Sequence, residues 1–103
     1  MTPPDHVRID LILDQPLLNE VKQLAKQAGL TGYTLLPALG GEGLGGAWSE
    51  DLVTGAQTKL VFMAVTSESK ADSFMEALKP LLETYGLVVL SAPVSVVRSS
   101  KFD

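Results

Sequence analysis

Five glycines close together near the middle of the chain are the residues best suited to binding a small ligand. Gly40, Gly41, Gly43, Gly45 and Gly46 fall within seven positions. Glycine lets successive backbone N–H groups converge, and the concavity that they form suits phosphate or another small anion. A flexible hairpin would have the same composition. The glycines therefore predict either an anion site or a hairpin.

Three basic residues stand where they could complete an anion site. Lys59 begins the apolar run that follows the glycine-rich stretch, and Arg98 and Lys101 come after the last apolar run of the chain. The guanidinium of arginine offers a planar pair of donors that fits phosphate oxygens. The alternative for all three is a solvated surface charge, and for Lys59 and Lys101 this alternative is favoured.

Trp48 and the carboxylates Glu50 and Asp51 follow the glycines. The tryptophan could anchor a protein partner or pack back onto its own domain. The chain has no cysteine and a single histidine, His6, so it lacks the residues for a zinc cluster, a catalytic thiol or a serine-histidine triad. We therefore expect no metal at Glu50 and Asp51 and no catalytic residue.

The composition predicts one domain that spans residues 1–103. With 46% hydrophobic and 19% charged residues, the chain can form a single core without disulfides. Its formal net charge of −4 argues against bulk nucleic-acid binding. No apolar run approaches the roughly 20 residues of a membrane span, and no signal pattern is present. We expect a cytoplasmic protein that binds neither nucleic acid nor membrane.

Hydrophobic periodicity predicts four strands and two helices. Apolar residues that alternate indicate strands, and apolar residues at intervals of three and four indicate helices. The expected strands are His6–Leu13, Tyr33–Leu39, Lys59–Val65 and Leu87–Arg98. The expected helices run from about Leu17 to Ala28 and from about Ser67 onwards. Gly40–Ala56 is expected to be a long, irregular and flexible loop, because glycine is costly in regular structure.

Glycine and proline mark the ends of these elements. Gly29 fits the left-handed conformation that ends a helix. Pro80 removes a backbone donor, so we expect the second helix to kink or break near Lys79. Pro37 falls in the second strand and Pro93 interrupts the fourth. A proline in a strand belongs at a sheet edge, so both strands are expected to be edges.

The order strand, helix, strand, strand, helix, strand predicts an α+β fold, the ferredoxin-like βαββαβ sandwich, whose first and third strands are central. Both helices of this fold cover the same face of the sheet. The other face would carry the apolar residues Ile12, Val61, Met63, Val65, Val88 and Leu90. Because an apolar face of this size is unfavourable in water, we expect the chain to self-associate.

The run from Gly29 to Thr34, which reads Gly-Leu-Thr-Gly-Tyr-Thr, resembles the corresponding stretch of PII signal-transduction proteins. The starts of the first strand and of the glycine-rich stretch, the run Val94–Arg98 and the order of elements match as well. The resemblance implies a homotrimer that binds adenine nucleotide in clefts between subunits. It also implies that the long loop docks onto a transporter or an enzyme.

The resemblance implies roles for particular residues of this chain. Those expected to line the adenine pocket are Ile9, Thr34 and Met63. Those expected to contact the phosphates are Gly40, Gly41, Arg98 and Lys101. Those expected to hold bicarbonate or another anion are Gly41, Gly43 and Lys59. Those expected to meet a protein partner are Trp48, Glu50 and Asp51.

One departure from the family concerns the polyphosphate. Where the family has a loop with glycine and lysine after the second helix, the turn Glu83–Leu87 is short and has no Lys or Arg. We therefore expect AMP or ADP to bind at least as well as ATP. The long loop also has no tyrosine for the modification known in the family. The chain resembles the branch found with bicarbonate transporters and carboxysomes, which implies bicarbonate as a second ligand and a role in inorganic-carbon metabolism.

Two other functions are compatible with this architecture. An enzyme such as acylphosphatase would need a glycine-rich cradle and an arginine near the first helix, and Asp14–Leu18 offers neither. A trimeric adaptor, or a protein like the copper-tolerance proteins of similar fold, would need no nucleotide site. We favour a non-enzymatic sensor whose loop responds to ligand.

Overall fold

A computed structural model describes residues 5–43, 46–49, 59–98 and 102. These described residues form six strands and two α-helices, with a 3₁₀ turn, Gln15–Leu17, before the first helix. The strands are β1 (His6–Asp14), β2 (Thr34–Ala38), β3 (Gly40–Gly43), β4 (Gly46–Ser49), β5 (Lys59–Ser67) and β6 (Val88–Val94). The α-helices are α1 (Leu18–Gln27) and α2 (Glu68–Thr84).

The main sheet is antiparallel, with the strand order β2-β5-β1-β6. The two strands predicted to be central are central, and the two that contain proline are edges. Pro37 lies opposite Leu60 of β5, and Pro93 lies opposite Val7 of β1. The βαββαβ prediction is therefore confirmed, and both prolines occupy strands that have a free side.

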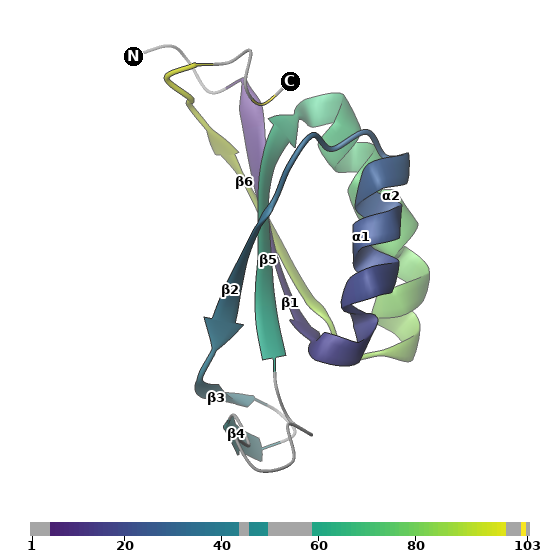
Figure 1. The fold of residues 1–103 in the computed structure, drawn as a ribbon, viewed down its shortest axis with the longest axis vertical. Helices are drawn as coiled ribbons and strands as arrows, with labels where there is room; N and C mark the ends of the chain where they lie inside the picture. Colours follow the sequence, from purple (N-terminus) through teal and green to yellow (C-terminus); the bar gives the residue numbers. More distant parts are fainter. Residues whose placement is uncertain (1–4, 44–45, 50–58, 99–101, 103) are drawn as a thin grey trace.

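The core lies between the sheet and the two helices, which cover the same face of the sheet (Figure 1). The strands contribute Ile9, Leu11, Leu13, Phe62 and Ala64, and the helices contribute Val21, Ala25, Ala71, Phe74, Leu78 and Leu81. The rings of Phe62 and Phe74 meet at a centroid distance of 5.8 Å. This face of the sheet is thus filled by the chain itself.

The end of α1 has the conformation that its sequence predicts. Gly29 has a φ of +89°. Its N–H donates to the carbonyl of Lys26, and the N–H of Leu30 donates to the carbonyl of Ala25. These two bonds form a Schellman motif, which satisfies carbonyls that the helix leaves free.

Of the predicted kink or break near Lys79, the break is wrong, because α2 continues through Pro80 to Thr84. Pro80 cannot donate to the carbonyl one turn earlier. The buried residues nevertheless continue at helical spacing on both sides, with Leu78 and Leu81 packed in the core. Burial of that stripe offsets the lost hydrogen bond.

Two further boundaries differ from the prediction. The predicted loop contains the hairpin β3–β4, in which Gly41 lies opposite Trp48 and Gly43 opposite Gly46. Glycine can form this ladder because the hydrogen bonds come from the backbone, and Gly46 has a φ of +108° at the turn. The last strand ends at Val94 rather than Arg98, because Val94 already lies opposite His6, the first residue of β1.

Replacing Gly29 by alanine should destabilise the fold by about 1–2 kcal/mol, because an alanine there must adopt positive φ. Gly32→Ala is the matched control. The φ of Gly32 is not positive, and a Cβ there would meet no atom within 4 Å. Urea unfolding at one protein concentration compares the two variants. Equal free energies of unfolding would contradict the assignment of Gly29 as the helix stop.

Candidate functional site

The face of the main sheet opposite the helices is left uncovered by the described chain (Figure 1). We call it the open face, and its members include Arg8, Asp10, Ile12, Thr34, Leu36, Val61, Met63, Val65, Val88 and Leu90. Cross-strand register aligns its apolar members, because Ile12 lies opposite both Val61 and Val88. Leu90 is 57% exposed, and Leu36 and Val88 are also exposed. The apolar second face predicted from the sequence is present.

An ion pair lies among these apolar side chains, and the sequence-based interpretation missed it. Arg8 Nε donates to Asp10 Oδ2 at 3.0 Å, and Arg8 Nη2 donates to Asp10 Oδ1 at 3.2 Å. The pair is bidentate, so its geometry is better defined than that of a single-contact surface pair. The sequence did contain a signal for this pair, because side chains alternate between the two faces of a strand and positions 8, 10 and 12 of β1 therefore share one face.

The three residues expected around an adenine do not share one surface. Thr34 opens β2 directly opposite Met63 of β5, so these two are neighbours on the open face. Ile9 is fully buried in the core beneath the helices. It lies opposite Ala64, one residue along β5 from Met63 and therefore on the other side of the sheet. Only the backbone of Ile9 remains available to a ligand at the open face.

Gly40, Gly41, Gly43 and Lys59 lie at one end of the main sheet. Lys59 begins β5 opposite Ala38, two residues before Gly40. The glycines belong to the β3–β4 ladder, which corresponds to the hairpin alternative. Lys59 Nζ contacts Asp14 Oδ1 at 2.7 Å. An anion at Lys59 would therefore compete with the Asp14 carboxylate.

Arg98 lies at the other end of the sheet. It follows Val94 by four residues, and Val94 pairs with His6, which also pairs with Ser67 at the far end of β5 from Lys59. The described residues that follow β6 stay at that end, near the start of β1 (Figure 1). Nine residues of β5 span about 26 Å at 3.3 Å per residue. A single chain therefore separates Arg98 from Lys59 and the glycine hairpin.

The turn after α2 offers no cation. Glu83 is exposed, and the last turn of α2 has no basic residue. The carbonyls at the C-terminal end of a helix carry partial negative charge, which disfavours a nearby phosphate. Lys79, further back on α2, already pairs with Glu76 at 2.8 Å, and the hydrogen bond and charge of that carboxylate raise the pKa of the Lys79 ammonium.

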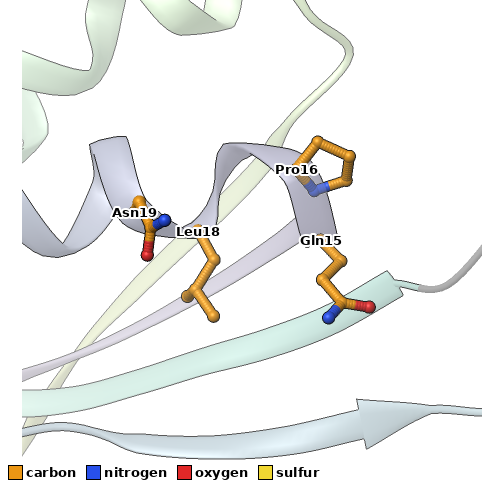
Figure 2. A pocket seen from close by; sticks show the side chains of 4 residues that line it. All are labelled: Gln15, Pro16, Leu18 and Asn19. Atoms are coloured by element: carbon orange, nitrogen blue, oxygen red, sulfur yellow. The ribbon is translucent and has the colours of Figure 1, made fainter.

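The described surface includes two shallow hollows. One of about 400 Å³ is lined by Gln15, Pro16, Leu18 and Asn19, none of which carries a charge (Figure 2). The other, of about 270 Å³, lies beside the end of α1 and the segment Leu30–Tyr33, and Lys22 and Lys26 are among its lining residues. Tyr33 in this second hollow stacks on Phe62 at 4.7 Å between ring centroids.

Some predicted contacts lie outside the described part of the chain. Glu50, Asp51 and Lys101 are among them, and Trp48 is described only as a member of β4. Within the described ranges, no three acidic, histidine or cysteine residues come together as a metal site. Neither described α-helix is both long and apolar enough to cross a membrane.

The βαββαβ topology and the run Thr31-Gly32-Tyr33-Thr34 before and into β2 are those expected of a PII-like α+β protein, and the comparisons support the same class. The family model of nitrogen regulatory protein P-II matches residues 7–101. The chain belongs to this family. No curated protein matches it significantly.

Three solved structures illustrate the similarity. CPII of Thiomonas intermedia, a nitrogen regulatory PII-like protein bound to ADP, AMP and bicarbonate, superposes with a TM-score of 0.85 at 24% identity, over 94% of this chain and 92% of its own. The structure of CPII with ADP and bicarbonate superposes with a TM-score of 0.84 at 26% identity, over 95% of this chain and 94% of its own. A PII-like signalling protein of Thermus thermophilus superposes with a TM-score of 0.82 at 22% identity, over 95% of each chain.

Proposed function

We propose that this chain is a non-enzymatic PII-like sensor that binds AMP or ADP in preference to ATP, together with bicarbonate. It acts as a homotrimer and signals through the loop of residues 40–56 to a transporter or enzyme of inorganic-carbon metabolism. The observation that carries the proposal is the 26% identical CPII structure with ADP and bicarbonate, which covers 95% of this chain.

The distribution of the candidate residues supports a site between copies. Gly40, Gly41 and Lys59 lie at one end of the sheet and Arg98 at the other, so one chain cannot present all of them to one phosphate group. A neighbouring copy can bring its Arg98, with Lys101 in the following tail, to the glycine end of the first. The nucleotide would then connect two subunits and respond to their arrangement.

Thr34 and Met63 are the described side chains best placed for the base. They are cross-strand partners on the open face, and Met63 is half-buried. The sulfur-containing side chain of methionine adapts to a flat ring. Bicarbonate would use the hairpin residues Gly41 and Gly43 and the Lys59 ammonium, in competition with Asp14.

A trimeric adaptor without nucleotide is the second candidate. It is favoured by the position of the two hollows beside α1, because neither is lined by Arg98 or by the hairpin glycines. Nucleotide titration separates it from the sensor, because an adaptor would assemble as a trimer and bind none of the nucleotides tested.

The protein should be a trimer of about 33 kDa, three times the 11.0 kDa chain, at micromolar concentration. Covering the half-exposed Leu36, Val88 and Leu90 contributes on the order of 1 kcal/mol each in every subunit. Light scattering coupled to gel filtration measures the mass. A mass of 11.0 kDa would contradict the trimer.

ATP should bind no better than ADP or AMP, and about tenfold weaker if its γ-phosphate finds no cation. The physical reason is the turn Glu83–Leu87, which follows a helix end without basic residues. Calorimetric titrations with AMP, ADP, ATP and cyclic AMP, each with and without bicarbonate, measure the four affinities and rank them. Clearly tighter binding of ATP would show that another cation replaces the missing lysine.

Arg98→Ala should weaken ADP binding by about 10- to 150-fold, because a guanidinium can donate to two phosphate oxygens and alanine to none. Arg98 is exposed and beyond the last strand, so the trimer should stay intact. Lys26→Ala on the exposed side of α1 is the control and should change little. Unchanged ADP affinity in Arg98→Ala would favour the adaptor.

A further inference from the structure

The ion pair on the open face has an unusual environment. Asp10 lies opposite Met63 on one side and Leu90 on the other, and Arg8 lies opposite Val65 and Ala92. Two opposite charges are thus surrounded by apolar cross-strand neighbours. Asp10 is already mostly covered, with 23% of its side chain exposed, while Arg8 remains 49% exposed.

A partly exposed ion pair of this kind contributes little to the stability of one chain, because water still competes for its charged groups. The energetic contribution of the pair changes when another surface covers it and excludes water. Loss of one partner then leaves a buried, uncompensated charge, whereas replacing both by apolar groups is often neutral for stability. The best-attested use of such a buried polar contact is to fix register and the number of copies.

The remaining hydrogen-bonding capacity of the pair points to a second copy as the occupant. Arginine has five N–H donors, and Asp10 accepts from two of them. The carboxylate likewise retains acceptor capacity. The pair is neutral as a whole and presents both free donors and free acceptors within an apolar face. Another copy of the same face supplies the matching apolar area and the complementary polar groups.

We propose that the Arg8–Asp10 pair sets the register and copy number of the interface formed by the open faces. This inference rests on the proposed trimer, and it adds which residues make that trimer a single defined species. The apolar residues of the open face supply the driving force for association, and they carry little directional information. The ion pair supplies the direction, because its donors and acceptors are satisfied in few arrangements.

Single and double substitutions on β1 test the proposal. Arg8→Met and Asp10→Leu each leave one charge unpaired at the interface and should raise the dissociation constant of the trimer by roughly 100-fold or more. The double variant R8M/D10L should assemble within about tenfold of the wild type, since neither charge is left. Native mass spectrometry should show it as a mixture of oligomers instead of one trimer.

The exposed pair on α2 provides the matched control. Lys79 and Glu76 are 2.8 Å apart, with 64% and 71% of their side chains exposed. Lys79→Met and Glu76→Leu, singly and together, remove the same kinds of groups from the helix layer and should leave trimer affinity and homogeneity unchanged. Circular dichroism of every variant reports whether the fold itself is retained.

The outcomes separate this inference from the trimer on which it rests. A wild-type protein that is monomeric would overturn both. A wild-type trimer with single variants that assemble equally well would overturn only the role of the ion pair. A double variant that forms one homogeneous trimer of wild-type affinity would likewise show that the apolar residues alone determine register. Strong loss in both single variants and a heterogeneous double variant would support the proposal.

Discussion

Two helices can cover only one face of a four-stranded sheet, and the rest of this molecule follows from that constraint. The alternation along β1 places Ile9, Leu11 and Leu13 beneath the helices, where all three are buried. The same alternation places Ile12 on the other side, opposite Val61 and Val88. A core on one face therefore leaves an apolar surface on the other, and the proposed association of copies would cover it.

The antiparallel order β2-β5-β1-β6 explains why the candidate ligand contacts are divided. β2 and β6 run along opposite edges of the sheet, and the segments that follow them leave at opposite ends. The glycine hairpin extends β2 beyond Ala38 at the Lys59 end, and Arg98 follows β6 at the His6 end. In a fold with this connectivity, the two candidate phosphate contacts would come together only if copies packed against one another. In this account, assembly and ligand binding depend on the same geometry.

The strand and helix types and the strand order were predictable from the sequence, because alternation and the edge prolines Pro37 and Pro93 are local signals with one structural solution. The course of α2 was not, since the packing of Leu78 and Leu81 outweighs the local effect of Pro80. The glycine hairpin was left as one of two alternatives, because glycines pair through their backbones and give no alternation of apolar side chains from which a strand can be predicted. The Arg8–Asp10 pair was overlooked, although the alternation of side chains along β1 places both residues on one face. Ile9 was assigned to the adenine pocket from the resemblance, which carries no information about the face of the sheet that its side chain occupies.

The central claim is that ADP binds between two copies of this chain. A crystal structure of the protein grown with ADP and bicarbonate tests it most directly. The account predicts that the ADP phosphates contact the Gly40–Gly43 segment of one subunit and Arg98 of its neighbour. It also predicts that Thr34 or Met63 lies within contact distance of the base. Phosphates bound wholly within one chain, or a trimer that crystallises without nucleotide at saturating ADP, would contradict it.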